Sequence, residues 1–341
     1  VIEGFYGRQW SMDTRHAYAD YLAALGLNTY IYAPKGDAWL RRHWQQPWPT
    51  DLAIALSGLA ERYRAKGLEF GVGLSPCELY RNYGVTERES LRRKVLAIQQ
   101  LGGTLLSILF DDMPGDLDCL AERQAQIVAD VCHWVPDLRI QTCPTYYSFD
   151  PVLEKYFGPM PSDYWPSLGS AMPADVDVFW TGNQVCSNAL SLQDVSAITG
   201  EMGRPVLLWD NYPVNDGAVR SRRLYCQPLA DRDAGLGVEL TGHLCNPMNQ
   251  SLLSLPALTG IAALYGTAPE HGEISRMLGD ETWLRLQQYQ VLFREEGLDG
   301  IGEERSREIA GECVSLPGQA AAEVAAWLRG EYTFDPACLT D

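Results

Sequence analysis

The chain has 341 residues, 46% of them hydrophobic and 10% aromatic, which is enough to build one large domain or a domain with a smaller appendage. Its 27 basic and 44 acidic side chains give a formal charge of −17, which argues against a phosphate-binding surface and so excludes DNA and RNA as direct ligands. No stretch approaches the roughly 20 apolar residues that cross a bilayer, so we expect no membrane association.

Nine cysteines are scattered along the chain without a CxxC pair, a pattern typical neither of a secreted disulfide framework nor of a zinc site. We therefore expect reduced, mostly buried thiols, no metal, no cofactor and a cytoplasmic location. The chain opens at Val1 in a strand-like run, and this start is compatible with the removal of a leader or an upstream domain.

Short apolar runs alternate with longer amphipathic stretches up to Tyr265, which is the pattern of βα units. Eight parallel strands close a (β/α)8 TIM barrel. We therefore predict an α/β fold with such a barrel over residues 1–267. Its eight expected strands are Val1 to Phe5, Asn28 to Ala33, Glu69 to Leu74, Thr104 to Phe110, Leu138 to Cys143, Val176 to Trp180, Pro205 to Trp209 and Val238 to Leu244.

The helices expected between these strands are clearest in the first half of the chain. Thr50 is the expected N-cap of the second, and the spacing of Thr86 and Glu89 fits a capping box at the third. Prolines obscure the pattern after Asp150, and residues 268–341 are expected to form a helical appendage. The expected helices are Asp13 to Leu25 opened by Ser11 and Met12, Thr50 to Lys66, Thr86 to Gln100, Ala121 to Trp134, Glu281 to Arg294 and Gln319 to Arg329.

Nearly every predicted strand ends in a polar or glycine-containing cluster. In a (β/α)8 barrel the carboxyl ends of the strands meet at one rim, where active sites lie. Each cluster alone also fits ordinary turn chemistry, but the recurrence of Asp, Lys, Asn and Tyr favours one shared pocket. The clusters include Gly4 to Arg8, Pro34 to Asp37, Ser75-Pro76, Asp111-Asp112, Pro144 to Tyr147, Thr181 to Asn183, Asp210-Asn211 and Asn246 to Asn249.

Two adjacent aspartates, Asp111 and Asp112, directly follow the fourth run. Successive strand residues point to opposite faces, so neighbouring carboxylates can serve one pocket only where the strand ends and the chain turns. In a partly desolvated pocket, burial and mutual repulsion should hold one proton between them near neutral pH, giving one acid and one anion.

Several roles for this pair remain open at this point. A magnesium site would need further oxygen ligands, and no third acidic residue stands in an obvious ligand arrangement. A helix cap is also compatible with the Pro114-Gly115-Asp116 that follows. An ordinary retaining pair needs carboxyls about 5 to 5.5 Å apart across the scissile bond, which adjacent residues reach poorly. A substrate whose own acetamido oxygen is the nucleophile would need only one carboxylate to orient the amide and one to protonate the leaving group.

Seven segments together resemble, in order and spacing, the catalytic domain of glycoside hydrolase family 84, which contains the O-GlcNAcases and related bacterial β-N-acetylglucosaminidases. The likeness spans roughly residues 1 to 265. It implies a (β/α)8 barrel and a substrate-assisted, retaining hydrolysis through an oxazoline intermediate. The segments are Val1 to Arg8, Asn28 to Lys35, Leu109 to Asp112, Cys143 to Thr145, Trp180 to Gly182, Trp209 to Asn211 with Asn215-Asp216, and Asn246-Pro247.

The resemblance also implies roles for individual residues. Asp111 would orient and polarise the acetamido group, and Asp112 would act as general acid and then as base for water. Tyr147 matches the tyrosine that hydrogen-bonds the acetamido oxygen, and Cys143 and Trp209 match the wall of the acetyl pocket. The positions that match contacts to the sugar hydroxyls and amide are Gly4, Lys35, Asn211, Asp216 and Asn246.

The chain departs from the family pattern at Gly36, where many members have a second acidic residue, and within residues 113–118 and 212–214. These departures bear on leaving-group preference and affinity. We expect a β-N-acetylglucosaminidase that acts on O-GlcNAc proteins or small glycosides. The alternatives are a non-hydrolytic GlcNAc-binding protein and a hyaluronidase-type endo-glycosidase. Family members are often dimeric through C-terminal helices, so a homodimer is a further expectation.

Overall fold

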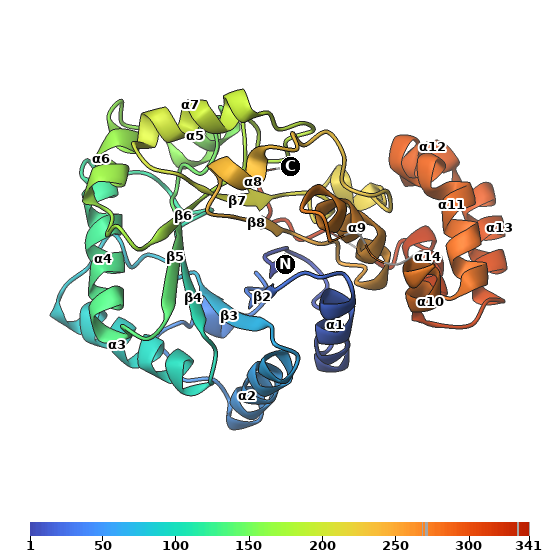
Figure 1. Ribbon diagram of the computed structural model, residues 1–341, viewed down its shortest axis with the longest axis horizontal. Helices are drawn as coiled ribbons and strands as arrows, with labels where there is room; N and C mark the ends of the chain where they lie inside the picture. The colour runs from blue at the N-terminus through green and yellow to red at the C-terminus, as the bar shows by residue number, and fades with distance from the viewer. Residues whose placement is uncertain (268, 270–271, 333, 341) are drawn as a thin grey trace.

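The computed structural model describes residues 1–267, 269, 272–332 and 334–340. Eight parallel strands follow one another around the sheet in chain order, and helices surround them (Figure 1). This arrangement confirms the predicted (β/α)8 barrel. The strands are β1 Ile2–Glu3, β2 Thr29–Tyr32, β3 Glu69–Leu74, β4 Leu105–Leu109, β5 Arg139–Cys143, β6 Asp177–Trp180, β7 Leu207–Asp210 and β8 Gly242–Cys245.

Polar contacts bring the start of the chain against the residues that follow β8. The backbone N–H of Gly4 donates to Asn246 Oδ1 at 3.2 Å, and the Tyr18 hydroxyl donates to the carbonyl oxygen of Ser251 at 2.7 Å. Trp10 Nε1 reaches the carbonyl oxygen of Asn249 at 3.1 Å. Because these partners are more than 230 residues apart, the contacts curl the row of strands into a barrel.

Helices α1 to α9 pack around the strands. The side chain of Ser11 accepts the N–H of Thr14 and caps α1, which confirms the predicted start. The barrel helices are α1 Met12–Ala24, α2 Thr50–Ala65, α3 Val85–Gln100, α4 Leu120–Trp134, α5 Val152–Phe157, α6 Tyr164–Ala171, α7 Leu192–Met202, α8 Leu236–Glu239 and α9 Leu255–Leu264, with 3-10 turns at Ala38–Leu40, Arg220–Arg222 and Leu252–Ser254.

Two predicted caps are wrong. Pro49 holds the cap position of α2, so Thr50 is already helical. Gly84 precedes α3, and Thr86 lies inside the first turn, where its carbonyl accepts the hydroxyl of Ser90. Pro49 already holds the cap position before Thr50, and Gly84 already holds it before Thr86. Neither threonine side chain is therefore needed to accept a backbone N–H at the start of its helix.

The predicted start of the eighth strand is also wrong. Residues Leu236–Glu239 form helix α8, and Val238 is 88% exposed on it, while β8 begins only at Gly242. A single turn of helix is too short to show a 3.6-residue period, so its apolar side chains resemble the start of a strand.

The C-terminal helices form a separate group beside the barrel (Figure 1). Trp327 Nε1 donates to the carbonyl oxygen of Ser221 at 3.0 Å, which attaches this group to the loop after β7. The expected boundary between residues 267 and 268 falls at a position outside the described residues. The helices are α10 Glu273–Leu278, α11 Asp280–Glu295, α12 Gly297–Ile301, α13 Glu303–Val314 and α14 Gln319–Leu328, of which α10, α12 and α13 were not predicted.

Within the described ranges, no helix has both the length and the apolar character needed to span a membrane. Four of the nine cysteines are buried, at positions 143, 226, 245 and 313, and Cys119 is exposed.

Candidate active site

One cavity at the carboxyl rim of the barrel collects all the site residues predicted from the sequence. They come from the ends of β1, β2, β4, β5, β7 and β8, so six strands contribute to a single pocket. The predicted residues that line it are Gly4, Lys35, Asp111, Asp112, Cys143, Tyr147, Trp209, Asn211, Asp216 and Asn246.

The adjacent aspartates both line this cavity because the chain turns directly after β4. The strand ends at Leu109, and Asp112 adopts a positive φ of 59°, in the left-handed region that side chains other than glycine rarely occupy. Such a conformation costs about 1 to 3 kcal/mol and is kept where the surroundings impose it. The turn therefore brings two neighbouring carboxylates to one pocket.

Asp111 is buried and paired on one side only. Its Oδ2 forms an ion pair with Lys35 Nζ. Its Oδ1 is also buried and accepts no hydrogen bond from the described residues. Burial raises the pKa of the Asp111 carboxyl; Lys35 opposes that rise, and the charge of Asp112 adds to it. The Oδ1 atom is thus a desolvated acceptor without a partner, which is costly unless a ligand donor uses it.

Asp112 is surrounded by hydroxyl donors. The Tyr6 hydroxyl donates to its Oδ2 at 2.7 Å, and Tyr147 reaches its Oδ1 at 3.4 Å. Lys35 Nζ lies 3.8 Å from the same Oδ2. Asp112 therefore shares Lys35 with Asp111 but is held mainly by tyrosine side chains.

Two asparagines and a tryptophan that line the cavity are joined by hydrogen bonds. Asn211 Oδ1 accepts both Trp209 Nε1 at 3.0 Å and Asn246 Nδ2 at 2.9 Å. Gly4 lies so close to the Trp209 ring that an added Cβ would come within 2.4 Å of it. Position 4 must therefore lack a side chain for the indole to lie where it does.

Asp216 lies in the loop after β7 and faces the same cavity. Its Oδ2 accepts the backbone N–H of Tyr6 at 2.8 Å. Burial raises the pKa of the Asp216 carboxyl to about 6, although the hydrogen bond from Tyr6 opposes the rise. Its other carboxylate oxygen can accept from a ligand hydroxyl.

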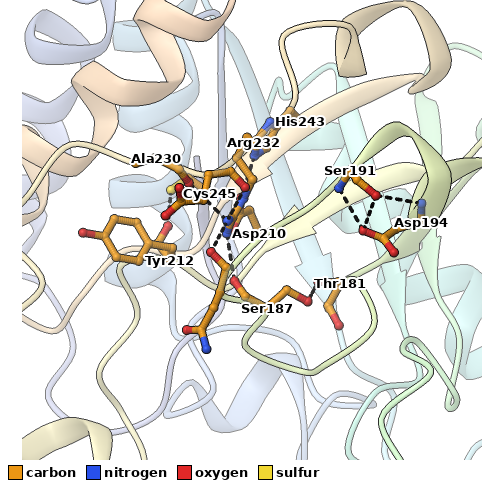
Figure 2. Close-up of polar contacts among 12 residues, drawn as sticks. Thr181, Ser187, Ser191, Asp194, Asp210, Tyr212, Ala230, Arg232, His243 and Cys245 are labelled. Atoms are coloured by element: carbon orange, nitrogen blue, oxygen red, sulfur yellow. Dashed lines mark hydrogen bonds and ion pairs between the residues drawn. The ribbon is translucent and has the colours of Figure 1, made fainter.

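The residue between Trp209 and Asn211 points away from the cavity. Asp210 binds Arg232 Nε at 2.8 Å and His243 Nε2 at 3.1 Å, as Figure 2 shows. Burial would raise the pKa of Asp210, but the hydrogen bonds from Arg232 and His243 outweigh burial and lower it. This buried ion cluster fixes the end of β7, from which Trp209 and Asn211 project into the pocket.

Eight further residues belong to the site and were not predicted as site residues. Tyr6 lies inside the Val1 to Arg8 segment, so its hydroxyl could have been suspected. Arg41 stacks on the Tyr6 ring at 5.1 Å, but it lies in a loop without any recognisable pattern. The others line the cavity: Thr181, Val185, Cys186, Val214, Cys338 and Thr340. The last two stand far along the chain in a segment with no motif.

The described part of the chain contains no group of three or more His, Cys, Asp or Glu side chains arranged to hold a metal ion. The fold and the cavity define a barrel protein whose strand ends form one acidic, aromatic-walled pocket of the kind that glycoside hydrolases use. A model of the beta-N-acetylglucosaminidase family matches residues 1–282, and the chain belongs to that family.

Individual relatives agree with this assignment. The chain is 28% identical over 275 residues to the proteins named protein O-GlcNAcase of *Rattus norvegicus* and *Mus musculus*; the match covers 78% of this chain but only 29% of those proteins. A solved structure of a *Thermobaculum terrenum* O-GlcNAc hydrolase mutant matches with a TM-score of 0.79 and 28% identity, covering 97% of this chain and 80% of that one.

Proposed function

We propose that the chain is a retaining β-N-acetylglucosaminidase that removes terminal β-GlcNAc from O-GlcNAc proteins or small glycosides by substrate-assisted catalysis. The rat and mouse relatives are named for protein O-GlcNAc, and the *Thermobaculum* relative for O-GlcNAc hydrolysis. We assign the catalysis to the barrel, residues 1–267. The homodimer and the cytoplasmic location stay predictions.

The observation that carries the proposal is the buried Asp111 Oδ1. An amide N–H is the donor that such an acceptor needs, and the acetamido group of GlcNAc supplies one. Held by this bond, the acetamido oxygen attacks the anomeric carbon, the bond to the leaving oxygen breaks, and a cyclic oxazoline forms. The carboxylate form of Asp111 stabilises the charge that develops on the amide nitrogen, and Lys35 favours that form.

Asp112 is proposed to donate its proton to the leaving oxygen and then to take a proton from the water that opens the oxazoline. Its hydrogen bonds from Tyr6 and Tyr147 orient the carboxyl group in the cavity. The two roles agree with microscopic reversibility, because the acid of the first step becomes the base of the second.

The remaining side chains are proposed to bind the sugar. Asp216 and Asn246 provide acceptors and donors for its hydroxyls, while Trp209 and Cys143 enclose the acetyl methyl group. The Trp209 and Asn246 side chains are already fixed through Asn211, so little ordering accompanies binding.

Hydrolysis of β-GlcNAc glycosides with good and poor leaving groups tests the assignment. Asp112→Asn should lower kcat/KM about 10²- to 10⁴-fold on a poor leaving group, which needs protonation, but far less on an acidic phenol. Asp111→Asn should lower kcat/KM about 10²- to 10³-fold on both substrates, because both need the oriented amide. Steady-state rates with the two substrates measure this difference.

Equal losses for both variants on both substrates would contradict the assigned roles. Stepwise fluorination of the substrate acetyl group provides an independent control, because fluorine weakens the carbonyl oxygen as a nucleophile. A rate that does not fall with fluorination would exclude attack by the acetamido oxygen. Binding of GlcNAc without any hydrolysis by the unmodified chain would indicate a sugar-binding protein instead.

A further inference from the structure

The C-terminal segment, residues 334–340, returns from the helical group to the barrel and reaches the candidate active site. Cys338 and Thr340 line the same cavity as Asp111 and Asp112. Both side chains are half-buried, whereas Leu339 between them is 44% exposed. Cys338 and Thr340 therefore turn toward the pocket, and Leu339 turns away from it. The chain therefore places its own side chains where a ligand would lie.

One contact just before this segment and one turn within it shape its course toward the cavity. Before it, the Tyr332 ring packs under the guanidinium of Arg8, 5.1 Å from the ring centre, next to the end of β1. Within it, Asp335 forms a turn by accepting the N–H of Ala337 at its side chain and the N–H of Cys338 at its carbonyl, both at 2.9 Å. The turn directs the residues that follow it into the pocket.

Inside the cavity the segment contacts a group proposed to bind the substrate. Tyr147 Oη lies 3.5 Å from Thr340 Oγ1 and 3.4 Å from Asp112 Oδ1. A phenol has one proton to donate, so a proton that Tyr147 gives to Thr340 is not given to Asp112. A sugar whose acetamido oxygen needs the Tyr147 proton competes with Thr340 for it.

Thr340 also has the chemistry of an O-GlcNAc acceptor, a threonine hydroxyl on an extended polypeptide. It contacts the same Tyr147 hydroxyl as Asp112, the acid that would protonate such an oxygen. The segment thus resembles the polypeptide part of a protein substrate from which the sugar has been removed.

We propose that residues 334–340 are an intramolecular competitor of the substrate, occupying the polypeptide side of the cavity through Cys338 and Thr340 and leaving when a glycosylated polypeptide or a sugar binds. This inference rests on the proposed function. A tethered competitor acts at a high effective concentration. The apparent affinity of every ligand for the cavity is then reduced in proportion to the fraction of molecules whose segment has left the cavity.

Replacement of residues 334–340 in the full chain by a Gly-Ser sequence of equal length tests the competition. The dissociation constant of a GlcNAc-thiazoline inhibitor, measured by calorimetry, should fall by about threefold or more, since the open fraction rises. The double variant Cys338→Ala with Thr340→Ala should shift it in the same direction. Leu339→Ala, whose side chain faces solvent, is the matched control and should leave it unchanged. Unchanged affinity in both test variants would overturn the proposal.

The rate at which a maleimide alkylates Cys338 in the unmodified chain gives a second readout, followed by peptide mass mapping. Saturating GlcNAc-thiazoline should raise this rate, because the segment leaves the cavity. A rate that is equal or slower with the inhibitor would show that the segment and the sugar bind together, which contradicts competition.

The two proposals can fail separately. If a chromogenic β-GlcNAc glycoside is hydrolysed but the variants and the alkylation rate show no competition, only the competitor is wrong. If neither the unmodified chain nor the Gly-Ser variant hydrolyses the glycoside or binds the inhibitor, the proposed function fails and the competitor with it.

Discussion

The side chains of the cavity are held in place by one another at the level of single atoms. Asn211 uses its oxygen for Trp209 and Asn246 and its Nδ2 for the carbonyl of Val185 at 2.9 Å. Asp111 Oδ1 is the exception, a buried oxygen with no donor among the described residues. Because the other polar atoms of the site are almost all paired, the unpaired Asp111 Oδ1 indicates where a ligand must donate a hydrogen bond.

The titration of one residue, Asp216, predicts that ligand binding depends on pH. Burial raises its pKa to about 6, so the group is a carboxylate above pH 6 and takes up a proton as the pH falls through 6. The protonated form offers fewer acceptor lone pairs to a sugar hydroxyl. We therefore expect the dissociation constant of GlcNAc-thiazoline to rise several-fold between pH 7 and pH 5, as measured by calorimetry.

Asp216→Asn separates this effect from the titration of other groups. The variant should bind more weakly at pH 7 and lose the part of the pH dependence that lies near 6. Asp118→Asn, at an exposed position outside the cavity, is the control and should bind as the unmodified chain does. An unchanged pH profile in Asp216→Asn would assign the dependence to another group, such as Asp111.

At the scale of elements, neighbouring side chains at the end of β7 have different roles: one lines the cavity and the next stabilises the fold. Trp209 faces the pocket and Asp210 faces the outer side, where it binds Arg232 and His243. Arg232 Nη1 and Nη2 also donate to the carbonyls of Asn188 and Ser187. One buried carboxylate therefore connects β7, β8 and the loops that follow β6 and β7.

Asp210→Asn should destabilise the fold strongly. It leaves the charge of Arg232, whose side chain is 3% exposed, without its counter-ion. Removing one partner of a buried ion pair costs about 3 to 5 kcal/mol, and we expect the free energy of unfolding in urea to fall by that amount. The matched control is Asp177→Asn, whose partner Arg139 is 43% exposed, and its loss should stay within about 1 kcal/mol. Equal small losses would mean that Arg232 finds other partners.

The sequence predicts elements well where they are long and poorly where they are single turns. Strands β3 and β4 and helices α1 to α4 were expected within one to two residues, because each carries a long apolar pattern. Helix α6 was missed because it contains Pro166, which sits in the first turn, where its missing N–H has no helical partner to lose. A turn as short as α8 carries no period at all.

The candidate site follows the same rule. Residues directly at strand ends, such as Asp111 and Asn246, were expected because the barrel brings strand ends together. Thr340 could not be expected, because its place in the cavity depends on how the helical group directs the chain back to the barrel. No local pattern in the sequence reports such a long-range contact.

At the scale of the whole molecule, the helical group and the barrel meet around one buried carboxyl. Glu323 of α14 accepts the hydroxyl of Ser251 at 2.8 Å and the backbone N–H groups of Leu252 and Leu253 at 3.0 and 3.2 Å, all in the segment after β8. Burial raises the pKa of Glu323 to about 7, although these hydrogen bonds oppose the rise.

The contact between the helical group and the barrel should therefore contribute less to the free energy of unfolding as the pH rises. The Glu323 pKa is about 7 in the folded chain and 4.5 for a glutamate in water, so its contribution to stability is complete below pH 4.5 and is lost as the pH rises through 7. At about 1.4 kcal/mol per pKa unit this amounts to about 3 kcal/mol.

Glu323→Gln should remove that part of the pH dependence of the free energy of unfolding, measured in urea between pH 4.5 and pH 8. Glu304→Gln, on the exposed face of α13, is the control and should keep the full slope. If Glu323→Gln and the unmodified chain lose stability in parallel over this range, Glu323 remains a carboxylate in the folded protein, and its hydrogen bonds to the loop after β8 outweigh its burial.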